Sequence, residues 1–178
     1  SLSARRGPAV DPAVAQQTDA LRRRAAHLHQ ANRPEELEVC LKRILELIPN
    51  DSQALFNLGV LCNERGELGA AEHYLRQLIE VDPDYLDAYL ALGGIYYATR
   101  QLLKAIKAYE LGLARAPTRL PLLGSLLVAR LSERVPAHIK TVCERIIAID
   151  YENPDANTFL AWSLIAMGED MEGALACA

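Results

Sequence analysis

The chain has 178 residues with 23 acidic and 19 basic side chains, which gives a net charge of −4. This balance provides no electrostatic argument for nucleic-acid binding. Half of the residues are hydrophobic, enough for a folded core, but no apolar run approaches the roughly 18 residues that a membrane-spanning helix needs.

The first eleven residues differ from the rest. They show no hydrophobic period, and the stretch SLSARRGPAV lacks the apolar centre of a secretion signal. We predict a disordered tail over residues 1–11. Asp11 followed by Pro12 fits an N-cap and a first helical position, so the first helix is expected to begin near Pro12.

A period of 34 residues organises the remaining chain. Pro49, Pro83 and Pro117 lie 34 residues apart, and each follows an apolar helical stretch, as a residue at a helix end does. Pro34 and Pro136 lie three periods apart, where a second helix would begin. The period divides a single array, residues 12–178, into repeats 18–51, 52–85, 86–119 and 120–153 and a shortened repeat 154–178.

Each full repeat has the hydrophobic pattern of two helices. In the second repeat Leu55, Leu58 and Cys62 give helical spacing, residues 65–67 form a turn, and Leu75 and Leu78 begin a second apolar face. A turn of about three residues makes the two helices antiparallel.

Two glycines lie in the middle of first helices, where they are normally unfavourable. Gly59 and Gly93 are one period apart, and Ala71 and Ala105 are the corresponding residues of the second helices. We therefore predict that the backbones of each pair approach closely there. In the fourth repeat both places hold larger residues, Leu127 and Ile139, which predicts a wider separation.

These residues resemble the tetratricopeptide repeat family, whose 34-residue unit follows the pattern W-x2-L-G-x2-Y, A-x3-F and P. The resemblance covers residues 18–178. It implies an all-α fold, a right-handed superhelical solenoid of antiparallel helix pairs. The matching residues of the third repeat are Tyr89, Leu92, Gly93, Tyr96, Ala105, Tyr109 and Pro117, and those of the second are Leu55, Leu58, Gly59, Cys62, Ala71, Leu75 and Pro83.

The resemblance also implies a concave groove lined by the first helices. In this family the groove positions recur in every repeat, and here they include Gly124 and Asp155. The residues that we expect to contact a partner are Arg22, His29, Phe56, Asn57, Val60, Asn63, Leu90, Tyr97, Val128, Leu131 and Trp162.

One subset of the family binds the C-terminal carboxylate of heat-shock chaperones with Lys, Asn and Arg side chains. Arg22 and Asn57 stand at about the right places, but the others hold Ala26, Asp87 and Ala91, so this clamp is broken. The mainly apolar lining instead favours an amphipathic helix or an extended peptide with large side chains.

The sequence predicts no enzyme, no cofactor and no metal site. HExxH, P-loop and nucleophile-elbow motifs are absent from it. Cys40, Cys62, Cys143 and Cys177 form no CxxC pair and fall in apolar helical stretches, which favours buried, reduced thiols and a cytoplasmic protein.

The hypothesis is a cytoplasmic, bacterial protein-interaction scaffold that binds a protein or peptide, with no nucleic-acid or membrane partner. The apolar stripe and the shortened fifth repeat also predict a weak homodimer. One alternative is an accessory domain that positions the substrate or partner of a larger enzyme, such as a bacterial glycosyl- or sulfotransferase. Another is a periplasmic assembly factor.

Overall fold

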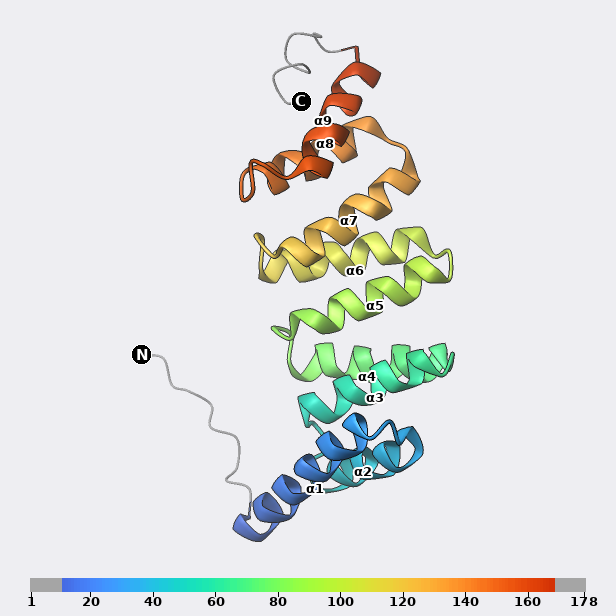
Figure 1. Ribbon diagram of the computed structural model, residues 1–178, viewed down its shortest axis with the longest axis vertical. Coiled ribbons are helices and arrows are strands. Elements are labelled where there is room, and N and C mark those ends of the chain that lie inside the picture. Colours follow the sequence, from blue (N-terminus) through green and yellow to red (C-terminus); the bar gives the residue numbers. More distant parts are fainter. Residues whose placement is uncertain (1–10, 169–178) are drawn as a thin grey trace, which may run out of the picture. The chain divides into compact units, whose positions relative to one another are not determined.

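The computed structural model describes residues 11–168, and within this range the chain forms nine α-helices and no strand (Figure 1). The predicted tail, apart from Asp11, and Cys177 lie outside the described residues. The chain divides into two compact units, unit 1 (Ser1–Val81) and unit 2 (Asp82–Ala178). The helices of unit 1 are α1 (Pro12–Gln30), α2 (Pro34–Leu47), α3 (Ser52–Glu64) and α4 (Leu68–Val81). Those of unit 2 are α5 (Leu86–Ala98), α6 (Leu102–Arg115), α7 (Leu120–Glu133), α8 (Pro136–Ile147) and α9 (Pro154–Ala166).

The predicted all-α fold of antiparallel helix pairs is confirmed. In Figure 1 short turns join α1 to α2 and α3 to α4 in unit 1, and α5 to α6 and α7 to α8 in unit 2. The helix starts keep the 34-residue period, because α3, α5, α7 and α9 begin at residues 52, 86, 120 and 154. The grouping of all repeats into one array stays a prediction.

Polar side chains cap several first helices. Asp51 accepts a hydrogen bond from the backbone N–H of Ala54 at 2.8 Å, and Asn153 accepts one from Ala156 at 3.0 Å. Asp11 caps α1 in the same way, and α1 begins where the sequence predicted. Such caps satisfy backbone donors that have no partner inside the helix, and they fix the residue at which the helix begins.

The turn inside each helix pair requires a left-handed backbone. The residues at this place are spaced by 34 and have positive φ angles: Asn32 at 52°, Gly66 at 75°, Arg100 at 62° and Arg134 at 60°. Gly168, which follows α9 at the same spacing, has a φ angle of 70°. Glycine and asparagine adopt this conformation readily, but an arginine does so at a cost of about 1–2 kcal/mol. The two arginines show that the turn geometry is imposed by the packing of the helices that it joins.

The mid-helix glycines lie at the interface of each pair, as predicted. The atoms nearest to them belong to large side chains of the second helix and not to the predicted small residues Ala71 and Ala105. A Cβ added at Gly59 would lie 2.8 Å from the side chain of Leu75, closer than the backbone oxygen of Ala71 at 3.6 Å. At Gly93 an added Cβ would overlap the ring of Tyr109. Each glycine therefore accommodates a large side chain of the second helix.

The cores consist of buried aliphatic and aromatic side chains from both helices of each pair. In unit 1 they centre on Leu41, Ile44 and Leu58. In unit 2 Leu127 and Ile139 are both buried, and the backbones of α7 and α8 approach closely over less of their length than those of α5 and α6. The wider separation expected for the fourth repeat stays a prediction.

The predicted burial of the cysteines is confirmed for the three that the structure describes, Cys40, Cys62 and Cys143. Burial raises the pKa of all three thiols, and it raises the pKa of Cys143 to about 11. A high thiol pKa leaves little thiolate at neutral pH, so these residues behave as small hydrophobic side chains.

Gly93 and Gly94 provide a matched test of the packing at the helix-pair interface. We expect Gly93→Ala to destabilise the protein by about 1–3 kcal/mol, because the new methyl group overlaps the ring of Tyr109. Gly94→Ala should instead stabilise it by about 0.5–1 kcal/mol, because no described atom lies within 4 Å of the added Cβ and alanine favours the helix. Urea denaturation of both variants measures the difference, and equal effects would contradict the packing described here.

The strained turns provide a second test. Arg100→Gly and Arg134→Gly should each raise the free energy of unfolding by about 1 kcal/mol, because glycine removes the left-handed strain. Arg23→Gly, at an exposed position in the middle of α1, is the control and should lower it by about 1 kcal/mol. Thermal denaturation distinguishes the two directions, and a loss of stability in all three variants would exclude strain at these turns.

Candidate functional site

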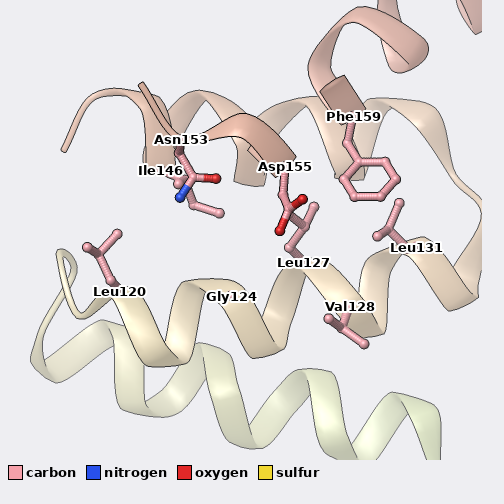
Figure 2. Close-up of a pocket in the computed structure, with 9 residues that line it drawn as sticks. All are labelled: Leu120, Gly124, Leu127, Val128, Leu131, Ile146, Asn153, Asp155 and Phe159. Carbon is pink, nitrogen blue, oxygen red and sulfur yellow. The ribbon is translucent and has the colours of Figure 1, made fainter. Parts of the chain in front are cut away.

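A cleft lies between the first helices α7 and α9 of unit 2 (Figure 2). In the described part of unit 2, α5 packs against α7, whereas α9 packs against α8 and does not approach α7 closely. The resulting space has a volume of about 340 Å³. Its lining residues are Leu120, Gly124, Leu127, Val128, Leu131, Ile146, Asn153, Asp155 and Phe159.

The lining is apolar apart from two residues at the start of α9. Figure 2 shows the Phe159 ring beside Leu131 and the Asp155 carboxylate projecting from α9 towards α7, next to Leu127. Gly124 leaves the middle of the α7 side open, because no described atom lies within 4 Å of a Cβ added there. A recess of this kind fits an apolar side chain, and the carboxylate at its rim adds a charge that can select among partners.

The local sequence explains why α9 stands away from α7. Helix α8 ends at Ile147, so residues 148–153 form a linker of six residues, longer than linkers 82–85 and 116–119. The Asn153 side chain accepts a hydrogen bond from the backbone N–H of Ala156 and donates one to Asp150 at 3.2 Å. These bonds hold the longer linker together and cap the start of α9. Tyr151 is at the place where earlier repeats have proline.

Two of the predicted contact residues of unit 2, Val128 and Leu131, meet in this cleft. Val128 is 49% exposed, and Trp162 on α9 is 46% exposed, three residues from Phe159 and therefore on a neighbouring part of the same helix face. That this exposed surface contacts a partner stays a prediction.

Tyr97 lines a second recess of unit 2, about 420 Å³ in volume, together with Ala98, Arg100, Leu102 and Ser132. Its hydroxyl lies 3.0 Å from the Ser132 hydroxyl on α7, which ties α5 to α7. The Tyr97 side chain is 36% exposed, and Leu90 on the same helix is half-buried. Tyr97 thus combines packing between neighbouring repeats with an exposed ring.

In unit 1 the structure gives Arg22 a partner within the chain. Its guanidinium donates to Asp51 at 2.6 Å and to Asp19 at 3.0 Å, and only 7% of the Asp51 side chain is exposed. Asp51 in turn caps α3, so Arg22 holds the start of α3 to α1. We therefore do not include Arg22 among the residues proposed to bind a partner.

The other predicted residues of unit 1 do not converge on a recess in the described structure. Phe56 and Val60 are half-buried on α3, and Asn63 on α3 and His29 on α1 are exposed. The Asn57 side-chain oxygen accepts a hydrogen bond from Gln53 at 3.1 Å. A single stripe that continues from Phe56 to Trp162 stays a prediction.

Sequence reasoning missed Phe159 and Leu120, both of which line the cleft. A signal for Phe159 was present, because the same place in the three preceding repeats holds Asn57, Ala91 and Ser125, all smaller or polar. Leu120 is the first residue of α7 and is 39% exposed. Leu120 does not occupy one of the family's groove positions, so the sequence pattern did not indicate that it lines a binding surface.

A charged cluster joins three helices of unit 2, α6, α7 and α8. Arg130 on α7 donates to Glu110 of α6 at 2.5 Å and to Glu133 at 2.8 Å, and His138 of α8 lies 2.9 Å from Glu133. The hydrogen bond from Arg130, with support from His138, holds the pKa of Glu133 below its ordinary value against the effect of partial burial. The Arg130 guanidinium thus links α7 to α6, and the Glu133 carboxylate links α7 to α8.

Two further observations limit the chemistry of the described residues. Residues 11–168 contain no group of three or more His, Cys, Asp or Glu side chains that could hold a metal ion. Among the helices that the structure describes, none is both long enough and apolar enough to cross a membrane.

Comparison with known proteins agrees with the repeat pattern. Residues 62–130 match the family model for the tetratricopeptide repeat. The resemblance predicted from the sequence is thus confirmed over this part of the chain. A search of the curated proteins gave no match.

Solved structures of tetratricopeptide proteins share the fold over most of the chain. MamA of Desulfovibrio magneticus RS-1 is 17% identical with a TM-score of 0.72, over 95% of this chain and 93% of that one. PilF of Pseudomonas aeruginosa is 20% identical with a TM-score of 0.69, over 88% and 71% of the two chains. TTC0263, a thermophilic TPR protein of Thermus thermophilus, is 21% identical with a TM-score of 0.60, over 90% and 87%. At these identities the likeness concerns the fold.

The charged cluster predicts a pH dependence of stability. A carboxyl whose pKa is lowered on folding stabilises the protein above its unfolded pKa, about 4.5, and this contribution is lost as the pH falls through the lower folded value. Glu133→Gln should therefore be about 1 kcal/mol less stable than the wild type at pH 7, and the difference should shrink as the pH falls below about 4.5.

Glu144→Gln is the control for this prediction, because Glu144 is exposed on α8 and its side chain has no ion pair among the described residues. Urea denaturation at several pH values measures both variants. A Glu133→Gln deficit that stays constant down to pH 3 would show that the charge of Glu133 is not responsible.

Proposed function

We propose that the chain is a protein-interaction module and that the α7/α9 cleft of unit 2 binds a segment of another protein. The observation that carries this proposal is an apolar recess open to solvent, flanked by exposed Val128 and Trp162. Tetratricopeptide repeats over residues 62–130 support it, because this fold presents its first helices to protein partners.

The recess offers a preformed site for an apolar anchor. Residues on α7 and α9 are held by their own helices and by the packing of both helices against α8, so little ordering accompanies binding. A helix or an extended peptide that inserts one large apolar side chain would cover Val128, Leu131 and Phe159. The predicted absence of enzyme activity is part of this proposal. The accessory-domain alternative, the location in the cell and the bacterial origin stay hypotheses.

Gly124 gives a variant that blocks the cleft without disturbing the fold. A leucine there would project into the recess, meet no described atom at its Cβ and favour the helix more than glycine does. Gly69→Leu is the matched control, because Gly69 is exposed on α4 of unit 1 and its added Cβ is equally free of contacts.

The test compares the wild type, Gly124→Leu and Gly69→Leu as bait in a lysate of the native host, with the captured proteins quantified by mass spectrometry. We expect at least one protein that the wild type and Gly69→Leu retain equally, and that Gly124→Leu reduces about tenfold or more. If all three baits retain the same proteins in the same amounts, the cleft is not the binding site.

A further inference from the structure

Among the described residues that line the α7/α9 cleft, only Asp155 has an ionisable side chain. It is exposed in the first turn of α9, and among the described residues no cation or hydrogen-bond donor of a side chain pairs with its carboxylate. In Figure 2 this carboxylate projects towards α7 beside the apolar side chain of Leu127.

Corresponding carboxylates of earlier repeats are paired. Asp87 lies two periods before Asp155 and Asp19 lies four periods before it. Each accepts a hydrogen bond from an arginine at 3.0 Å, Asp19 from Arg22 and Asp87 from Arg119. The second of these pairs joins the start of α5 to the start of α7. The two pairs differ, because Arg22 lies on the same helix as Asp19, whereas Arg119 lies at the start of the next first helix. Three residues after Asp155, at the place that corresponds to Arg22, the chain has Thr158, whose hydroxyl donates to the backbone oxygen of Pro154.

A partner that covers the cleft must compensate the negative charge of Asp155. Apolar contact with Val128, Leu131 and Phe159 would remove water from the neighbouring Asp155, and an unpaired carboxylate loses much of its hydration free energy when it is buried. A lysine or arginine on the partner would replace the lost hydration with an ion pair, while an acidic segment would add repulsion. The same carboxylate therefore rejects acidic or purely apolar partners and accepts basic ones.

We infer that the occupant of the cleft is a protein segment that carries one large apolar side chain close to a lysine or arginine. This rests on the proposed function and adds the chemistry of the partner. The apolar side chain fills the recess beside Gly124, whose volume of about 340 Å³ lies near the lower end for ligand pockets. The cation pairs with Asp155 at the rim.

The test is a selection of phage-displayed random twelve-residue peptides on the wild-type protein, followed by affinity measurements with the enriched peptides by fluorescence anisotropy. We expect Leu, Phe or Trp within about four residues of Lys or Arg, the reach of one helical turn. Replacing that basic residue by Glu should weaken binding about tenfold or more.

A charge reversal in the protein provides the sharper measurement. Selection on Asp155→Lys should enrich acidic peptides in place of basic ones, and Asp155→Asn should lose the preference for either charge. Glu152→Lys is the matched control, because it changes the net charge equally, and Glu152 is an exposed linker residue outside the cleft lining. It should keep the basic preference. Gly124→Leu should abolish binding of the same peptides.

The outcomes separate this inference from the proposed function. If the peptides bind equally to Gly124→Leu, or if none is enriched, the cleft is not a binding site and both fail. If Gly124→Leu abolishes binding but Asp155→Lys selects the same sequences as the wild type, the cleft binds peptides and the inference about charge is wrong. Analytical ultracentrifugation at the peptide-binding concentration adds one more outcome, because a dimer that Gly124→Leu disrupts would make a second copy the occupant and overturn the inference.

Discussion

Every helix pair that the structure describes depends on a chain reversal within about three residues, and one left-handed residue makes that reversal. In these pairs it stands at residues 32, 66, 100 and 134, whatever side chain the place holds, and Gly168 after α9 has the same conformation. The reversal sets the second helix antiparallel to the first and directs their apolar faces at each other. Because the packing of whole helices stabilises each pair by far more than 1–2 kcal/mol, two of these places tolerate an arginine.

Because the geometry of the helix pairs repeats, the features that repeat with it could be predicted from the sequence. The period, the helix starts and the fold follow from spaced prolines and apolar residues, because backbone geometry repeats wherever the pattern does. The role of Gly59 and Gly93 was predicted only in part. Their position at the interface follows from the pattern, but the atoms that fill the space depend on side-chain rotamers of Leu75 and Tyr109, which a pattern does not encode.

The candidate site was less predictable because it arises where the repetition is broken. Val128 and Leu131 were found from family positions, yet the recess between them and Phe159 exists because α9 packs on α8 without approaching α7. The longer linker 148–153 and the large residues Leu127 and Ile139 are visible in the sequence. Their combined effect on the separation of two helices requires three-dimensional packing. The pattern also gave no sign that the cation at one groove position, Arg22, is engaged by Asp51 of its own unit.

In each unit an ion pair joins one first helix to the start of the next first helix, but the positions of the acid and the cation are exchanged between the units. In unit 1 a cation of the first helix, Arg22, holds the acid at the start of α3, whereas in unit 2 an acid of the first helix, Asp87, holds the cation at the start of α7. Both pairs stabilise the contact between successive first helices, so charge at these places is normally used inside the protein. Asp155 departs from that use and stands beside an apolar recess. A charge that has no partner among residues 11–168, next to a surface that excludes water when covered, is the combination by which a repeat protein with a common fold can distinguish one partner from another.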